Sequence, residues 1–586
     1  MKILLVSFLF ILTVFSTGKC QIINKDQSSP IRPIDFKDIT ISSELSTRSV
    51  KNFSRLETDI YHPENVFPLK HDINSEGWPG DKEGRTILGL VLEAQANHLT
   101  PQYLEEMIHM IPQKVNAKGY LGPIQGDTIN EQQLSGHGWF LRGLCEYYIW
   151  KKDPKVKKYI LDIIQNLALP TRGYHKNYPI NPKQREMNVG AMAGTTQNVI
   201  NKWLLSSDIG CDFIFMDGVI QAYGLFPSPK LKELIDEMVA RFLQMDVVAI
   251  KAQTHATLTG ARALVRYYEI TGNKTLLQEA EKRYKIYREV GMTENYENFN
   301  WFGRPEWSES CAIIDSYMLA VQFWQHTQNA QYLEDAHQIY YNAICHAQRA
   351  NGGFGCDNCI GPKDETLKVH AYEAFWCCTM RGGEGLAKAI QYAYFTQGKN
   401  IYIPFYNNSV ASLFIDNKDV KIKQTTSYPF GTNATFELSS KSGSGNVIIN
   451  LFAPKWTSNH RVMINGQKVQ FTKANDFVTF PVKINKSTKI EYLFDMQTQI
   501  RAAINPSNTL KGRTAIVYGP LMLGYIGDTE ISFKKKPVIE RINDTNWKVT
   551  DENKSYGFTP VYHLLDKNVI EKSYKKQALF LINEKH

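Results

Sequence analysis

The sequence predicts a mainly helical domain that is followed by β-sandwich structure. Apolar residues recur at helical spacing from about residue 75 to residue 398, and the pattern changes to short β-rich runs near residue 399. A chain of 586 residues is also too long to pack around one hydrophobic core. We therefore expect two or three domains, with the helical domain first.

The first 20 residues have the pattern of a secretory signal peptide. Lys2 precedes an apolar run from Ile3 to Phe15, and small residues follow at positions 16–18. The run is too short to cross a bilayer comfortably and no later stretch reaches its length, so no membrane span is expected. Cys20 would suit a lipid anchor, but Lys19 is a poor neighbour for that cleavage. We expect an exported protein, periplasmic or secreted, rather than a lipoprotein.

Residues 21–74 are polar and carry several prolines, which predicts an extended N-terminal arm packed on the next domain. Residues 75–398 form the predicted helical domain. Helices there end in bulky pairs such as Tyr147–Tyr148, and a short polar break and a second amphipathic helix follow each pair. Such hairpins build either an open solenoid or a closed toroid. The long glycine- and aromatic-rich loops at 291–308 and 351–376 favour the toroid, because they could gather at one end and form a pocket.

From residue 399 onward the sequence predicts antiparallel β-structure. Turn-bounded runs such as 400–406, 445–452 and 477–484 are rich in β-branched and aromatic residues. We place one β-sandwich at residues 399–500 and a second β-region at residues 501–586.

Composition narrows the possible function classes. Hydrophobic residues make up 43% and aromatic residues 12% of the chain, which is typical of a globular protein with a large aromatic share. The formal net charge of +9 is spread along the chain without a basic cluster. Nucleic acid is therefore not expected as a partner.

A carboxylate and three thiols form the most informative group in the sequence. Glu309 and Cys311 lie two positions apart, and the adjacent pair Cys377 and Cys378 follows later in the helical region. This donor set suits a tetrahedral Zn²⁺. A bound metal keeps a thiol ionised at neutral pH, so such a sulfur could serve structure or attack an electrophilic carbon. Spacing alone leaves unrelated buried thiols as an alternative.

Cys356 and Cys359 form a C-x-x-C motif in a glycine-rich loop. The pair could be a small disulfide. It could also join Cys377 and Cys378 in a closed, all-thiolate zinc site with a structural role. The remaining cysteines of the mature chain have apolar neighbours and are interpreted as buried thiols; these are Cys145, Cys211 and Cys345.

Several short motifs spread over the mature chain occur together. They are Gly77-Trp78-x-Gly80-Asp81, Ser135-Gly136-His137, Thr254-His255-Ala256, Glu309-x-Cys311, Cys377–Cys378, Tyr402-Ile403-Pro404, Ile464-Asn465-Gly466 and Tyr518-Gly519-Pro520-Leu521. On these residues the chain resembles glycoside hydrolase family 127, whose characterised members include retaining β-L-arabinofuranosidases. The resemblance implies an (α/α)6 barrel followed by β-sandwich domains. It also implies a zinc held by Glu309, Cys311, Cys377 and Cys378, with Cys377 as the nucleophile.

The resemblance further implies a glutamate upstream of Glu309 as general acid/base. Family members have a Gly-Glu-x-Phe context, and here the nearest match is Tyr296-Glu297-Asn298-Phe299, at a shorter spacing. We assign the role to Glu297, with Glu294 and Glu306 as rivals. His137 and His255 each lie at the start of an aromatic-rich helix, and the resemblance assigns both to substrate binding.

Together these observations predict an exported, retaining exo-glycosidase with zinc as its cofactor. Its expected substrate is a plant cell-wall glycan that carries a terminal β-L-arabinofuranosyl or related furanosyl residue. A retaining reaction needs a nucleophile on one face of the sugar and a proton donor beside the leaving oxygen. Two alternatives remain: a non-catalytic carbohydrate-binding protein with a structural zinc, and a glycosidase for an acidic pectic furanose, suggested by Arg304.

Overall fold

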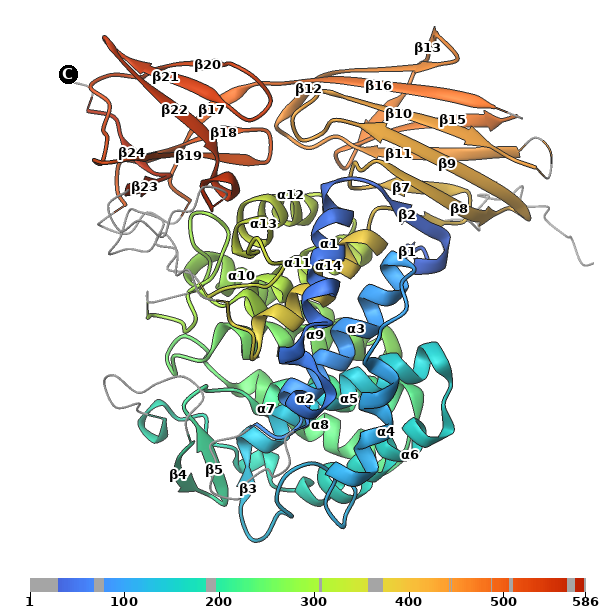
Figure 1. Ribbon diagram of the computed structural model, residues 1–586, viewed down its shortest axis with the longest axis vertical. Helices are drawn as coiled ribbons and strands as arrows, with labels where there is room; N and C mark the ends of the chain where they lie inside the picture. Colours follow the sequence, from blue (N-terminus) through green and yellow to red (C-terminus); the bar gives the residue numbers. More distant parts are fainter. Residues whose placement is uncertain are drawn as a thin grey trace, which may run out of the picture.

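The computed structural model describes residues 30–67, 78–185, 196–304, 308–356, 373–441, 443, 445–485, 487–504, 510–565 and 575–583. The predicted signal peptide at 1–20 lies outside these ranges, as do Glu306 and Cys359. Figure 1 shows the helices gathered in one body, with two regions of β-structure packed along one side of it. Among the described residues, no helix is both long and apolar enough to cross a membrane.

Six helices form a closed ring, in which each helix contacts the next and the last returns to the first. In ring order they are α3 (Asp81–Asn97), α5 (Glu131–Lys151), α7 (Asp212–Leu225), α9 (Thr254–Thr271), α11 (Ser310–Thr327) and α14 (Cys378–Gln391). Ring closure excludes the open solenoid and confirms the toroid. These helices are buried on almost every side, as in α7, where all residues from Asp212 to Ala222 are buried.

A second, amphipathic helix covers the outside of each ring helix. The outer helices are α4 (Leu104–Lys114), α6 (Pro154–Ile163), α8 (Pro229–Gln244), α10 (Lys274–Val290), α12 (Gln331–Ile339) and α1 (Glu44–Leu56). The shorter pieces of the body are α2 (Pro63–Val66), α13 (Cys345–Ala347) and a small sheet of β3 (Ile129–Asn130), β5 (Trp203–Ser206) and β4 (Thr196–Ile200). The arrangement of inner and outer helices is the (α/α)6 barrel that the sequence implied.

The prediction of an extended arm at residues 21–74 was wrong for residues 44–56, because they form helix α1. This helix packs on α14 and α3 and is the sixth outer helix of the barrel, as Figure 1 shows in blue. Its buried face includes Ser49 and Asn52 beside Leu45, Phe53 and Leu56. Leu45, Phe53 and Leu56 mark one face at helical spacing, so the signal was present in the sequence, and the prediction of an extended arm gave more weight to the prolines on either side.

Glycines let neighbouring ring helices approach until their main chains touch. A Cβ atom on Gly218 of α7 would lie 2.3 Å from the carbonyl oxygen of Gly138 in α5. A Cβ on Gly84 of α3 would lie 2.2 Å from the amide nitrogen of Phe140. Any side chain at these positions would push two helices apart, so the glycines set the width of the ring.

A buried network of ion pairs fills the ring. Arg142 Nη1 lies 2.6 Å from Asp217 Oδ2, and its Nη2 lies 2.8 Å from Glu384 Oε1. Arg262 Nη1 lies 2.7 Å from Asp315 Oδ1, which also accepts a 2.6 Å hydrogen bond from Arg381. Burial favours the neutral form of Asp217, but the adjacent arginines hold its pKa well below the usual range.

The β-sandwich consists of two sheets that follow the barrel in the chain. The first has the order β1-β6-β7-β11-β15-β14 and the second the order β13-β12-β16-β10-β9-β8-β2. Their strands are β1 (Arg32–Pro33), β2 (Ile39–Ile41), β6 (Phe395–Gln397), β7 (Asn400–Ile403), β8 (Ser409–Ile415), β9 (Lys418–Thr426), β10 (Asn433–Ser439), β11 (Gly445–Phe452), β12 (Thr457–Ile464), β13 (Gln467–Lys468), β14 (Thr472–Ala474), β15 (Phe477–Ile484) and β16 (Thr488–Met496). The N-terminal segment thus supplies one edge strand to each sheet.

A third sheet, with the order β17-β18-β19-β22-β21-β20, makes the last region. Its strands are β17 (Thr498–Ala502), β18 (Arg513–Tyr518), β19 (Leu521–Gly527), β20 (Val538–Arg541), β21 (Trp547–Asp551) and β22 (Lys554–Pro560), with β23 (Lys575–Gln577) on β19 and β24 (Phe580–Leu581) on β18. Leu510, Met522 and Leu579 belong to a small hydrophobic core of its own. Helical and β regions therefore follow in the predicted order.

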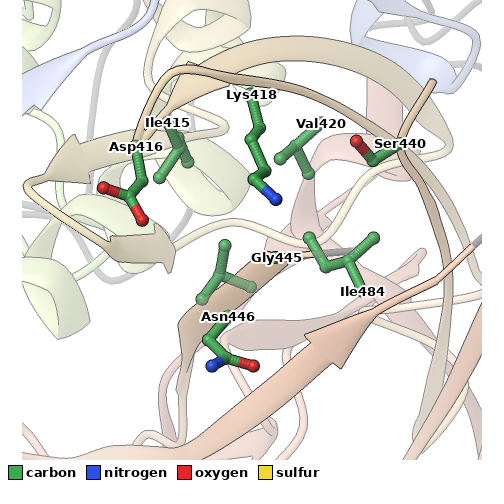
Figure 2. A pocket seen from close by; sticks show the side chains of 9 residues that line it. Ile415, Asp416, Lys418, Val420, Ser440, Gly445, Asn446 and Ile484 are labelled. Atoms are coloured by element: carbon green, nitrogen blue, oxygen red, sulfur yellow. The ribbon is translucent and has the colours of Figure 1, made fainter. Parts of the chain in front are cut away.

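The sandwich has a small hollow that is bordered by Lys418 and Asn446 (Figure 2). All of its lining residues come from the sandwich strands or the turns between them. The hollow therefore does not include any of the predicted site residues.

Candidate active site

Two ring helices begin side by side and bring the predicted metal ligands together. Glu309 is the N-cap of α11 and Cys311 lies in its first turn, while Cys377 is the N-cap of α14 and Cys378 its first residue. One carboxylate oxygen and the three Sγ atoms all lie within 4.8 Å of one another. Neighbouring N-termini in a closed ring therefore join residues that are far apart in the sequence.

The spacing of the sulfurs fits a zinc ion. Cys377 Sγ lies 3.3 Å from Cys378 Sγ, which lies 3.8 Å from Cys311 Sγ. Zn–S bonds of about 2.3 Å in a tetrahedron place sulfurs about 3.8 Å apart. The same distances are far longer than a disulfide bond of about 2.0 Å. Free thiols at this spacing, with a carboxylate beside them, suit Zn²⁺ by both chemistry and geometry.

A fourth thiol joins this group. Cys356 Sγ lies 3.6 Å from Cys378 Sγ. We call Cys311, Cys356, Cys377 and Cys378 the four-thiol cluster. Cys356, from the second ligand set considered in the sequence, therefore lies beside the first set, while Cys359 lies outside the described residues.

Positive charge lies next to the cluster. Arg85, on α3, donates a 3.2 Å hydrogen bond from Nη1 to Cys311 Sγ, and Asp81 fixes its guanidinium at 2.9 Å. Burial opposes ionisation of Cys378, but hydrogen bonds from the other three thiols hold its pKa well below the usual range. The protein alone therefore favours a thiolate on Cys378, whereas hydrogen bonds to the neighbouring thiols raise the pKa of the Cys377 thiol. Sequence reasoning missed Arg85, although it follows the Gly80–Asp81 motif by one helical turn.

Cys377 is the accessible member of the four-thiol cluster. The other three sulfur residues are buried, whereas Cys377 is only partly buried. The preceding residue, Trp376, is 48% exposed. A substrate that approaches this end of the barrel would therefore meet Cys377 first, beside an exposed indole.

The two predicted substrate-binding histidines have different surroundings. His255 stacks on Trp139 with ring centroids 5.6 Å apart, and its Nδ1 lies 3.4 Å from Glu309 Oε1. It therefore lies next to the cluster. His137 is fully buried; its Nε2 accepts a hydrogen bond from the Leu121 amide, and its Nδ1 bonds the Gln133 carbonyl. Because the main chain uses both ring nitrogens, His137 holds a loop against α5 and is not placed to bind a sugar.

The candidate acid/base glutamates are also separated by the structure. Glu297 is buried and its Oε1 lies 2.6 Å from His346 Nδ1, while its Oε2 has no hydrogen-bond partner among the described residues. The neighbouring Asn298 accepts a hydrogen bond from the Glu309 amide, which ties this loop to the cluster. Glu294 instead accepts a 2.7 Å hydrogen bond from the Ile504 amide in the third region.

Comparison with protein families gave two matches. Residues 290–391 match the profile described as "Beta-L-arabinofuranosidase, GH127 catalytic domain", and residues 400–496 match the GH127 middle domain of the same enzymes. The first match spans Glu309 and the whole four-thiol cluster. A search of curated proteins found no match.

Solved structures with the same architecture cover nearly the whole chain. A GH127 β-arabinofuranosidase matches 94% of this chain and 98% of its own, with a TM-score of 0.70 and 14% identity. A GH127 β-L-arabinofuranosidase from Geobacillus stearothermophilus T6 matches 94% of this chain and 100% of its own, with a TM-score of 0.69 and 13% identity. At these identities the likeness shows the fold, and it agrees with the closed ring of helices.

The two family matches lie next to each other in the chain, in the order and at the places where the barrel and the sandwich occur. They favour an enzyme over a binding protein that kept only the scaffold. The resemblance seen in the sequence is thereby confirmed: the chain is a glycoside hydrolase whose residues 290–391 and 400–496 are similar to the catalytic and middle domains of GH127.

Proposed function

We propose that this glycoside hydrolase is an exported, retaining exo-enzyme that removes a terminal β-L-arabinofuranosyl or related furanosyl residue from plant glycans. The names of the matching family domains support the sugar, and the signal-like pattern of residues 1–20 supports export. The observation that carries the proposal is Cys377, the partly exposed thiol at the start of α14. It has the access that a nucleophile needs, and a bound cation would have to keep it ionised, because hydrogen bonds to the neighbouring thiols raise its pKa.

Cys311, Cys377 and Cys378 would hold a zinc ion together with a fourth donor, for which Glu309 is close enough. The ion would supply positive charge that keeps the sulfurs ionised and fixes their direction. The Arg85 guanidinium and the N-terminus of α14 would add positive charge that acts in the same direction.

In the proposed reaction, Cys377 Sγ attacks the anomeric carbon while the bond to the leaving oxygen breaks. A carboxylic acid donates a proton to that oxygen, so the aglycone leaves as an alcohol. The resulting carboxylate then takes a proton from water, and the hydroxide oxygen displaces Cys377 from the anomeric carbon. Two displacements at one carbon return its original configuration.

We assign the acid/base role to Glu297. Its loop is tied to the cluster through Asn298, and its Oε2 has no hydrogen-bond partner among the described residues. Glu294 binds the third region through Ile504 and Arg501. His255 would bind the sugar from the other side of Glu309.

Hydrolysis of p-nitrophenyl β-L-arabinofuranoside tests the nucleophile. Cys377→Ser should lower kcat/KM by at least about 10³-fold, as expected when a nucleophile is removed. Cys345→Ser, a matched change at a buried thiol on α13, should leave kcat/KM unchanged. Equal loss in both variants, or full activity in Cys377→Ser, would rule out the assignment.

Two further measurements test the reaction type and the acid/base. NMR of the first sugar released should show the configuration of the substrate, and an inverted product would refute the retaining reaction. Glu297→Gln should slow glycosides with poor leaving groups far more than the nitrophenyl substrate, because only the former need a proton. The same selective loss in Glu294→Gln, with none in Glu297→Gln, would move the role to Glu294.

A further inference from the structure

Two exposed aromatic side chains directly precede the proposed nucleophile in the chain. Phe375 is 37% exposed and Trp376 is 48% exposed. Among the described residues, only one other exposed large hydrophobic side chain is aromatic, namely Phe414 in strand β8 of the sandwich. Folding normally removes such large apolar rings from water. Two of them together beside a candidate active site therefore suggest a binding surface.

The two rings contact each other. Their centroids lie 5.1 Å apart with an interplanar angle of 83°, so the edge of one ring meets the face of the other. Aromatic side chains favour this arrangement, and each ring restrains the other. We call Phe375 and Trp376 the aromatic pair.

Buried side chains hold the main chain beneath the aromatic pair. Tyr61, which is fully buried, donates a 2.7 Å hydrogen bond from its hydroxyl to the Phe375 carbonyl. Two residues earlier, the Glu373 carboxylate accepts hydrogen bonds from Arg55 at 2.9 Å and from Thr379 at 2.7 Å. A segment that is fixed in this way loses little conformational entropy when a ligand binds to it.

The aromatic pair lies on the exposed side of Cys377. The other thiols of the four-thiol cluster are buried. Gln253 and His255, which contact Glu309 and could bind a terminal sugar, are buried as well. When a terminal sugar occupies this inner part of the site, the rest of a glycan extends toward solvent. That is the side on which the aromatic pair is exposed.

We propose that Phe375 and Trp376 bind the sugar that carries the terminal furanose, by stacking against its ring. A sugar ring has hydroxyl groups around its edge and C–H groups on its faces. The C–H groups are apolar and weakly positive, which suits the negative face of an aromatic ring. This inference rests on the proposed function and adds the class of leaving group, which is a second sugar and not a small alcohol.

Kinetics with two leaving groups test this role in the full-length protein, supplied with zinc. Methyl β-L-arabinofuranoside and a β-L-arabinofuranosyl disaccharide have the same terminal sugar, but only the disaccharide has a second ring. We define the leaving-group ratio as kcat/KM for the disaccharide divided by kcat/KM for the methyl glycoside. Trp376→Ala should lower this ratio at least about tenfold, mainly through a higher KM for the disaccharide.

Two further variants serve as comparisons. Trp376→Tyr keeps an aromatic face and should retain most of the leaving-group ratio. Phe414→Ala removes an exposed aromatic ring from the sandwich and should leave the ratio unchanged.

An unchanged leaving-group ratio in Trp376→Ala would overturn the proposal. Equal losses for both glycosides give that result, and they are expected if the indole only supports the fold around Cys377 or touches the terminal sugar alone. Both values come from one protein sample, so a partly inactive preparation does not alter the ratio. If Trp376→Ala does not fold, Phe375→Ala decides by the same ratio, with an expected fall of at least about threefold.

The binding surface and the reaction can fail separately. In Cys377→Ser, saturation-transfer NMR with the disaccharide should show contact between the protein and the second sugar. Adding Trp376→Ala should weaken that signal. This result, with no hydrolysis by the parent protein, would support the aromatic pair and refute the proposed reaction. Hydrolysis by the parent with an unchanged leaving-group ratio in Trp376→Ala would support the reaction and refute the aromatic pair.

Discussion

His337 makes the junction between the barrel and the sandwich sensitive to pH. This residue of α12 is buried, its Nε2 donates to the Pro404 carbonyl at 2.9 Å, and its Nδ1 accepts from the Tyr428 hydroxyl at 3.1 Å. Its ring stacks on Phe405 with centroids 4.6 Å apart. Both ring nitrogens are thus hydrogen-bonded in the neutral form of the ring.

The size of the effect follows from the pKa of His337. Burial lowers it from 6.5 to about 4 in the folded protein. Between these values the unfolded chain binds a proton that the folded chain does not, so stability is lost as pH falls below about 6.5. At pH 5 this amounts to about 2 kcal/mol, and the effect reaches its limit below pH 4.

Urea unfolding, monitored by tryptophan fluorescence, can measure the contribution of His337 protonation to the free energy of unfolding. His337→Gln should be less stable than the parent at pH 7.5, because the stack on Phe405 is lost. The difference should shrink by about 2 kcal/mol between pH 7.5 and pH 5, since the variant has no ring to protonate. Tyr428→Phe keeps the buried ring and should keep the parent's pH dependence. A constant difference between His337→Gln and the parent would refute the reasoning.

Three further predictions concern the barrel and its metal. Gly218→Ala should destabilise the protein by about 1–3 kcal/mol and lower its melting temperature, because the new Cβ would clash with the main chain of α5. Gly557→Ala is the control: a Cβ there meets no atom within 4 Å, so the melting temperature should not fall. Glu384→Gln should cost about 3–5 kcal/mol in urea unfolding, because Arg142 and Arg262 both lose a buried counter-charge; unchanged stability would contradict the network. Removal of zinc with a chelator should lower the melting temperature, and added zinc should restore it, whereas identical melting with and without zinc would exclude a resident ion.

The barrel could be predicted because each of its helical hairpins is marked by local features of the sequence. Apolar spacing, aromatic helix ends and polar breaks recur from one hairpin to the next, and closing the ring needs only that the hairpins pack in order. Helix α1 was missed although Leu45, Phe53 and Leu56 lie on one buried face, because the prolines before and after it favoured an extended arm. The ion-pair network could not be foreseen, since Arg142 meets Glu384 across 242 positions of sequence.

The same distinction holds at the site. The paired cysteines and the Glu309–Cys311 motif had a spacing that pointed to a metal. Nothing in a C-x-x-C motif says which distant thiol its first member will meet, so the contact between Cys356 and Cys378 needed coordinates. For His137 the motif suggested a role in substrate binding that the structure does not support. The motif placed it at the start of a helix, but only the structure shows that the main chain uses both ring nitrogens.

The short strands β1 and β2 bear on how the protein is made. Ile41 pairs with Ser409 and Arg32 with Thr396, so an early segment of the chain completes sheets whose other strands are synthesised hundreds of residues later. At about 5–20 residues per second, that delay is roughly 20–70 seconds. Until then the edge strands β1 and β2 remain unpaired, and unpaired edge strands can pair with strands of other chains. An expression version that starts after residue 44 would leave both edges open permanently, and is expected to aggregate even though every site residue is present.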